Sequence, residues 1–207
     1  MAFTLIDVDT WERKEFYLHF INEVVCTYSV NVDMDITSLK GQRLYPAMLY
    51  LLTDTVNEYV EFRTHLSLKG VGFFDRMTPS YTIFNQENKN FSAIWTEFSE
   101  DYATFLRRYI EDTKTYCGST RYMPKAGKPD NCFDVSMLPW MTFTALNINV
   151  YDAGKYLLPI FTMGRTFERD RKTLLPLSIQ VHHAVCDGYH VSRFVETLQQ
   201  KIDHFDP

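Results

Sequence analysis

The run His182-His183-Ala184-Val185-Cys186-Asp187-Gly188 combines the residue types and the spacing that are best suited to chemistry in this chain. It follows a strand-like segment, residues 177–181, and a helix-like segment comes after it. Histidine exchanges a proton near neutral pH, so His183 at the end of a strand is a candidate general base. Asp187 either orients this base directly or pairs with an arginine and braces the turn. Gly188 permits backbone angles that other residues avoid.

Each candidate also has a purely structural interpretation. His183 can end a strand and bond locally, and spacing alone does not separate this role from that of a base. Cys186 has the chemistry of a nucleophile, but a cysteine beside a turn is more often a small buried hydrophobe. The Ser136 hydroxyl either bonds to the backbone or stabilises a developing oxyanion. His182 faces away from His183 if the strand continues, which argues against a metal pair.

Length and composition favour one packed, acidic domain. The chain has 207 residues, of which 45% are hydrophobic and 15% aromatic, and no linker-like segment divides it. We therefore expect a single domain over residues 1–207 with a substantial core. The formal net charge is -5, with no basic run. Nucleic acid is not an expected partner, because phosphate binding needs clustered lysine and arginine.

Metal binding, export and membrane insertion have no sequence signal. The cysteines form no C-x-x-C pair, and four further histidines have no partner that the sequence assigns: Cys26, Cys117, Cys132, Cys186, His19, His65, His190 and His204. We expect no bound metal. The N-terminus lacks a basic start followed by an apolar core, and no apolar run approaches the ~18 residues that span a membrane. These features are typical of a cytoplasmic protein with free thiols.

Strand periodicity recurs along the chain. Alternation of apolar and polar residues, or short apolar runs, predict strands at 26–34, 81–85, 91–98, 141–150, 157–166 and 174–182. Lys69-Gly70 separates two short apolar runs and is typical of a hairpin turn. Residues 117–131 are rich in glycine, proline and lysine, so we expect the longest loop there.

Helical periodicity appears in four places. Spacing of three and four predicts a short helix capped by Asp9 or Thr10, and longer helices that begin near Pro46, after Ser99 and near Tyr189. Mixed strands with about four helices predict an α/β (α+β) two-layer sandwich, in which helices cover a mixed β-sheet.

The run from His182 to Gly188, followed by Tyr189-His190-Val191, closely resembles the signature of the chloramphenicol acetyltransferase family. Further segments resemble family landmarks in the family's order: Trp11-Glu12-Arg13, Tyr45-Pro46, Tyr81-Thr82-Ile83-Phe84, Leu138-Pro139-Trp140 and Pro159-Ile160-Phe161-Thr162-Met163-Gly164. The resemblance spans essentially the whole chain. It is more specific than the isolated motif, which the dihydrolipoyl acyltransferase cores also carry. It implies a fold of the CoA-dependent acyltransferase type.

The resemblance implies a role for individual residues. His183 would be the general base that removes the proton from the 3-hydroxyl of chloramphenicol, which then attacks acetyl-CoA directly through a tetrahedral intermediate. Ser136 would donate to the oxyanion, and Thr162 would help to bind the transition state through water. Asp187 would pair with Arg13 and support the active-site turn.

Substrate contacts and assembly are also implied by the resemblance. Phe91 and Phe20 would line the antibiotic pocket, with Cys26 near it. This chain has phenylalanine at position 20 where some relatives have tyrosine, and Arg165-Thr166 where several have Lys-Tyr. These departures bear on affinity more than on the reaction. The family forms homotrimers, which implies active sites at subunit interfaces.

Two alternatives remain open at the level of sequence. The chain could acetylate another hydroxylated acceptor with the same base and the same thioester. It could instead sequester a hydrophobic ligand without chemistry, although a pure binding protein needs no base combined with an oxyanion donor. Product formation separates these classes.

Overall fold

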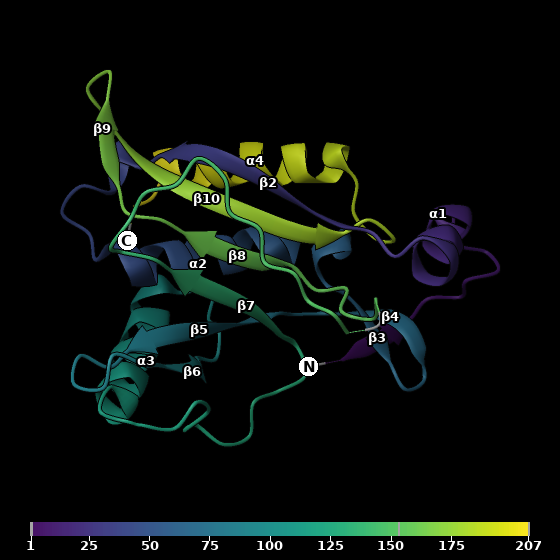
Figure 1. Ribbon diagram of the computed structural model, residues 1–207, viewed down its shortest axis with the longest axis horizontal. Helices are drawn as coiled ribbons and strands as arrows, with labels where there is room; N and C mark the ends of the chain where they lie inside the picture. Colours follow the sequence, from purple (N-terminus) through teal and green to yellow (C-terminus); the bar gives the residue numbers. More distant parts are fainter. Residues whose placement is uncertain (1, 153, 207) are drawn as a thin grey trace.

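The computed structural model describes residues 2–152 and 154–206, and a mixed β-sheet is its central element (Figure 1). In spatial order its strands are β2 (Thr27–Asp35), β10 (Lys172–His182), β8 (Ile160–Met163), β7 (Cys132–Met137), β5 (Thr78–Phe84) and β6 (Phe91–Trp95). A short strand, β9 (Phe167–Arg169), pairs with the beginning of β10. β7 runs parallel to β5 and β8, whereas the other pairs are antiparallel. This arrangement is a mixed sheet, as the sequence predicts.

A second, smaller sheet stands at the end of the molecule where β10 finishes. It consists of β1 (Phe3–Leu5), β4 (Gly70–Phe74) and β3 (Thr64–Ser67), all antiparallel. The hairpin between β3 and β4 turns at Lys69-Gly70, as predicted, and Gly70 adopts a φ of +125° that side-chain-bearing residues avoid. β1 lies so close beside β4 that a Cβ on Gly72 would be 2.3 Å from the Thr4 carbonyl oxygen.

Helices cover one face of the large sheet and give the molecule two layers (Figure 1). The helical elements are α1 (Lys14–Leu18), the π-helical turn η1 (His19–Glu23), η2 (Thr37–Leu39), α2 (Leu44–Glu58), η3 (Val60–Phe62), α3 (Tyr102–Tyr116) and α4 (Gly188–Asp203). In Figure 1, α2 and α4 lie behind the strands. The predicted two-layer sandwich is confirmed.

The core lies between the sheet and these helices because strand alternation sends every second side chain to the same face. Val135, Phe161 and Ile179 stand side by side in register on neighbouring strands and are fully buried. Phe194 of α4 stacks on Phe161, with ring centroids 5.3 Å apart, and on Phe62 of η3 at 4.4 Å. These contacts fix α4 against both the sheet and η3.

The opposite face of the sheet is polar. Ser136, Thr162, Ser178 and Asn31 form one row across four strands, because each is the register partner of the next. An irregular segment that follows β7 crosses in front of this face (Figure 1). Ser178 donates to the Leu146 carbonyl at 2.6 Å, and the Leu146 amide donates to Asn31 Oδ1 at 2.9 Å. Polar side chains thus hold an extended segment that forms no ladder.

Several strand predictions need correction. The strand predicted at 157–166 is confined to β8, and the one predicted at 91–98 ends at Trp95. The predicted strand at 141–150 is wrong: the segment is irregular, and none of the strands in the described part of the chain pairs with it. β7 was not predicted, although Phe133 and Val135 point into the core. Its six residues end two positions before Pro139, and so short an alternation is not distinguishable from loop sequence.

Two predicted helix starts also shift. α3 is capped by Asp101, whose Oδ2 accepts from the Thr104 amide at 2.8 Å, and not by Ser99. α1 begins at Lys14, several residues after the predicted cap. Asp9 instead pairs with the Lys14 ammonium at 2.6 Å, so its carboxylate bridges to the helix rather than capping it.

A matched pair of leucines tests the placement of the core. Leu198 of α4 is fully buried, whereas Leu68 at the hairpin tip is fully exposed. We expect Leu198→Ala to lower the free energy of unfolding by about 2–5 kcal/mol. Leu68→Ala should change it by less than about 0.5 kcal/mol. Urea unfolding measures both, and equal effects of the two substitutions would contradict this packing.

Candidate active site

His183 lies one residue beyond the end of β10. Its amide donates to the Cys26 carbonyl at 2.9 Å, which ties it to the chain entering β2. Phe20 lies parallel to the imidazole, with ring centroids 4.2 Å apart and an interplanar angle of 7°, and Tyr28 presents an edge at 5.3 Å. Phe20 belongs to the π-helical turn η1, a rare geometry that is frequent at functional sites. Two aromatic rings therefore fix the plane of the imidazole.

The turn that carries His183 is held by Arg13, which precedes α1. The guanidinium donates to both carboxylate oxygens of Asp187, at 2.6 and 2.7 Å. It also donates to the carbonyls of His183 at 2.8 Å and Ala184 at 2.9 Å. Only 13% of the Arg13 side chain is exposed. A planar guanidinium with this many donors fastens the turn at four points.

Asp187 lies close to the imidazole, but its carboxylate accepts hydrogen bonds from Arg13. Its Oδ1 is 3.0 Å from His183 Nδ1, yet the contact lacks hydrogen-bond geometry. Nδ1 is buried without a hydrogen-bond partner among residues 2–152 and 154–206. A third of the His183 side chain is exposed, which leaves Nε2 as the ring nitrogen available to a substrate.

Two pKa shifts follow from this arrangement. The hydrogen bonds from Arg13 lower the pKa of Asp187, with the Arg13 charge adding to the effect, so this carboxylate stays ionised. Burial raises the pKa of the Cys186 thiol, because charge is costly away from water. Cys186 is 1% exposed and remains a protonated thiol, which matches its interpretation as a small buried hydrophobe.

Ser136 and Thr162 form a second polar group on the neighbouring strands β7 and β8. Their hydroxyl oxygens are 2.9 Å apart in a hydrogen bond in which either can donate. When Thr162 donates, the Ser136 hydroxyl hydrogen is free for another acceptor. Ser136 is part-buried and Thr162 is 2% exposed. The pair therefore offers one oriented donor at the polar face of the sheet.

A single chain does not bring the two groups together. Thr162 is the register partner of Ser178, and His183 lies five residues farther along the strand direction, at least about 15 Å away. Phe91, on the edge strand β6 and 54% exposed, pairs with Phe84 at the Ser136 end of the sheet. Phe20 and Cys26 stand at the His183 end. The predicted site residues thus fall into two clusters.

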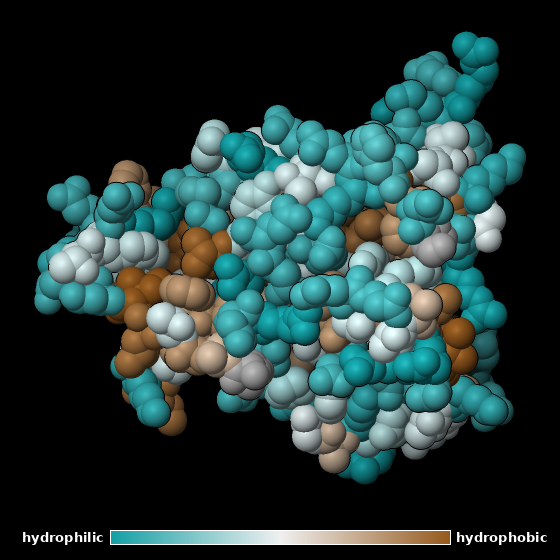
Figure 2. Space-filling model, turned by 180° about the vertical axis from the view of Figure 1, so that it is seen from behind, coloured by the Kyte–Doolittle hydropathy of each residue, from teal (hydrophilic) through white to brown (hydrophobic). Residues whose placement is uncertain are grey.

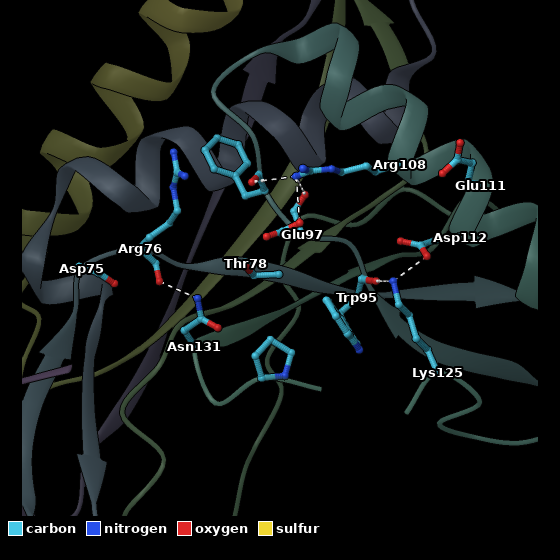
Figure 3. A pocket seen from close by; sticks show the side chains of 12 residues that line it. Asp75, Arg76, Thr78, Trp95, Glu97, Arg108, Glu111, Asp112, Lys125 and Asn131 are labelled. Carbon is cyan, nitrogen blue, oxygen red and sulfur yellow. Dashed lines mark hydrogen bonds and ion pairs between the residues drawn. The ribbon is translucent and has the colours of Figure 1, made fainter. Parts of the chain in front are cut away.

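A cavity of about 720 Å3 lies elsewhere, between α3 and the ends of β5 and β6 (Figure 3). None of the predicted site residues lines it. Its three cations already face carboxylates, in the pairs Lys125–Asp112, Arg108–Glu97 and Arg76–Glu100. The Lys125 ammonium also lies 4.1 Å from the Trp95 ring centroid. Because these cations already pair with carboxylates, we assign the charged side chains of this cavity a structural role.

The structure adds residues that the sequence did not assign. Tyr28 packs on His183 and donates to the Cys186 carbonyl at 3.2 Å. His190 Nδ1 accepts from the Asp187 amide at 2.9 Å. The sequence did contain a signal for this bond. His190 stands three residues after Asp187, a candidate N-cap, and a side chain at that position can reach back to the cap amide.

Metal and membrane features are also defined for the described part of the chain. Over residues 2–152 and 154–206, histidine, cysteine and acidic side chains do not gather in a group of three that could hold a metal ion. Over the same ranges, no helix has the length and apolarity needed to cross a bilayer.

The fold is that of acetyltransferase catalytic cores. A solved chloramphenicol acetyltransferase matches with a TM-score of 0.86 at 22% identity, covering 97% of this chain and 100% of that chain. A dihydrolipoamide acetyltransferase from Azotobacter vinelandii matches with a TM-score of 0.70 at 15% identity, covering 99% and 90%. The mixed sheet backed by helices is shared by these structures.

Sequence comparison then identifies the family. The family model described as chloramphenicol acetyltransferase matches residues 1–199. A chloramphenicol acetyltransferase of Clostridium perfringens is 46% identical over 213 aligned positions, covering 100% of this chain and 97% of the relative. One from Clostridioides difficile is 48% identical, covering 98% and 97%. The chain belongs to the chloramphenicol acetyltransferase family, and the predicted membership is confirmed.

The Arg13 clamp predicts a specific pH dependence of stability. We expect Arg13→Met to lower the free energy of unfolding by about 3 kcal/mol near neutral pH, because Asp187 is left charged and unpaired. The folded-state pKa of Asp187 is lowered. The pair therefore stabilises the fold above the ordinary carboxyl pKa of about 4, and this contribution is lost as the pH falls through the lowered value.

Urea unfolding of wild type and variant across this pH range measures the effect. The difference between them should shrink in acid. Arg107→Met is the control, since Arg107 is exposed on α3 and should change stability by less than about 0.5 kcal/mol. A difference that stays constant into acid would show that the Asp187 charge is not what Arg13 stabilises.

Proposed function

We propose that this protein transfers the acetyl group of acetyl-CoA to the 3-hydroxyl of chloramphenicol, with His183 as the general base. The observation that carries the proposal is that the imidazole of His183 is held in one orientation, in a chain that belongs to this family. Its turn is fastened by Arg13, its ring plane is fixed by Phe20, and Nε2 is left available. An oriented imidazole with one free nitrogen is the requirement for general base catalysis.

The reaction needs one proton to move twice. His183 Nε2 takes the hydroxyl proton as the hydroxyl oxygen bonds to the thioester carbonyl carbon. The carbonyl electron pair moves to oxygen and forms a tetrahedral oxyanion. Collapse restores the carbonyl, breaks the carbon–sulfur bond, and the departing CoA sulfur takes the proton from the imidazolium. A thioester is already activated, so positioning and a single base suffice without an acyl-enzyme. Cys186, buried and protonated, has no part in these steps.

Ser136 is the proposed oxyanion donor. Its hydrogen bond with Thr162 orients the hydroxyl before any substrate binds, and pre-orientation is what makes such donors effective. Asp187 and Arg13 are assigned to support of the turn, because the carboxylate is occupied by the guanidinium. Acetyl-CoA acts as co-substrate, and the proposed reaction involves no metal.

We further propose a homotrimer whose active sites lie between subunits. The separation of His183 from Ser136 within one chain supports this, since a base and an oxyanion donor must both reach the same reacting carbon. A neighbouring copy can place its Ser136, Thr162 and Phe91 opposite His183. Phe20 and Cys26, beside His183, then complete the antibiotic pocket.

Exposed apolar side chains support association at both ends of the sheet. Phe16, Val24 and Val25 are more than half exposed near His183, and Trp140 and Met141 are equally exposed after Ser136. Seen from behind, the helical face is largely hydrophilic, with brown side chains both toward the end that carries α1 and the small sheet and toward the opposite end (Figure 2). Apolar area of this kind marks surfaces that other chains cover.

A cytoplasmic location belongs to the same proposal. The four cysteines, all within the described ranges, are free thiols. Free thiols persist in a reducing compartment, where the proposed co-substrate acetyl-CoA is also available.

Release of the CoA thiol tests the reaction and the base together. With acetyl-CoA and chloramphenicol, wild type should release thiol only when the antibiotic is present. His183→Ala should lower kcat by about 10²–10⁴-fold or more. Ser136→Ala should lower kcat by about 10²–10³-fold with little change in KM.

The outcomes separate the competing functions. Absence of release from folded wild type would reject chloramphenicol as the acceptor, and stoichiometric antibiotic uptake without acetylated product would favour sequestration. Acetylation of a different hydroxyl compound would favour another acceptor. Full activity of His183→Ala would mean that the base is misassigned.

Mixed trimers test the shared site. His183→Ala and Ser136→Ala subunits are each nearly inactive as homotrimers. After random mixing by unfolding and refolding, one site in four pairs an intact His183 with an intact Ser136 from its neighbour, so about a quarter of the wild-type activity should return. Activity that stays at the sum of the two variants would place both residues of each site in one chain.

A further inference from the structure

His190 binds the backbone of Asp187 at a group that Arg13 does not contact, the amide. The Asp187 amide donates to His190 Nδ1 at 2.9 Å. A ring nitrogen that accepts a hydrogen bond carries no proton, so neutral His190 has its proton on Nε2. His190 is the third residue of α4, the position from which a side chain reaches back to the amide of the preceding cap.

Glu61 faces the other nitrogen of the same ring. Its Oε1 lies 3.6 Å from His190 Nε2, and the two side chains are only 24% and 22% exposed. A carboxylate beside Nε2 favours the tautomer in which that nitrogen carries the proton. Glu61 belongs to η3, which is fixed against α4 through the stacking of Phe62 on Phe194. The spacing between Glu61 and His190 is thus set by the core.

We propose that His190 and Glu61 are positioning residues for His183, and that they act through the backbone of Asp187. This inference rests on the proposed function, in which His183 is the base. Arg13 fixes the Asp187 carboxylate and the carbonyls of His183 and Ala184. His190 fixes the Asp187 amide. Arg13 therefore binds the carboxylate and two carbonyl oxygens of the turn, whereas His190 binds its Asp187 amide.

The two holds are not equivalent. The ion pair with Arg13 keeps the Asp187 carboxylate ionised and anchors the turn to the N-terminal segment. The His190 bond sets the direction in which the chain leaves the turn and enters α4. In the tautomer that Glu61 favours, His190 Nδ1 carries no proton and can accept from the Asp187 amide; in the other tautomer this bond would be lost.

Steady-state kinetics of three variants tests the inference. His190→Ala removes the acceptor and should lower kcat about tenfold, the worth of one good hydrogen bond, with KM for both substrates within about twofold. His190→Gln keeps an acceptor, because glutamine is a natural partner at this helix position, and should recover most of kcat. Glu61→Gln leaves His190 in place but removes the charge that selects its tautomer, and should lower kcat about threefold.

A double-mutant cycle shows whether Glu61 acts through His190. In the His190→Gln background, Glu61→Gln should have no further effect on kcat, because no imidazole tautomer remains to be selected. An equal loss in both backgrounds would overturn the role given to Glu61. His204→Ala, at the far end of α4, is the matched control and should leave kcat unchanged.

Direct observation of the tautomer keeps the test sharp if His190→Ala does not fold. In enzyme labelled with ¹⁵N-histidine, His190 should be protonated at Nε2 and unprotonated at Nδ1. A protonated Nδ1 in active wild type would overturn the inference, as would wild-type kcat in folded His190→Ala. Loss of kcat that His190→Gln does not restore would also overturn it. Inactive wild type would reject the proposed function as well, whereas active wild type with inactive His183→Ala and fully active His190→Ala would reject this inference alone.

Discussion

The guanidinium of Arg13 is the interaction on which the geometry of the candidate site depends. It joins the segment before α1 to the turn after β10, a contact across 174 residues of sequence. Because it uses both Asp187 oxygens and two main-chain carbonyls, it fixes the backbone on either side of His183. The same geometry braces the turn: a carboxylate bonded at both oxygens to a part-buried guanidinium stays ionised.

The sheet separates stability from chemistry by strand alternation. One face carries Val135, Phe161 and Ile179 into the core against α4. The other carries the row that includes Ser136 and Thr162, and it is covered by a segment that bonds through single polar contacts. The apolar core therefore lies on the face toward the helices, and the hydroxyls of Ser136 and Thr162 on the second face bond to each other. Under the proposed function, that second face meets His183 of a neighbouring chain.

Sequence periodicity predicted best the strands and helices that have one face packed entirely in the core. β10 and α4 match their predicted segments closely, because each has one face wholly in the core. The strand predicted at 157–166 shrinks to the four residues of β8, Ile160–Met163. Residues 141–150 have the alternation of a strand, but among the described residues their backbone makes only isolated bonds, such as that from the Arg165 amide to the Met141 carbonyl, and no ladder. β7 shows the reverse case, in which a parallel position between β5 and β8 makes a strand of six unremarkable residues.

The sequence by itself determined the chemistry that is available: an imidazole at a strand end, an aspartate and a glycine at fixed spacing, and a family resemblance that names a role for His183, Ser136 and Thr162. Tertiary structure alone decided which side chains share a place. Tyr28 packs on the imidazole, Phe20 stacks on it, and Glu61 faces His190. It also decided that Ser136 and His183 stand at opposite ends of the sheet. The physical reason is that spacing along a chain sets only local geometry, whereas contacts between distant segments depend on strand order and on how helices pack against the sheet.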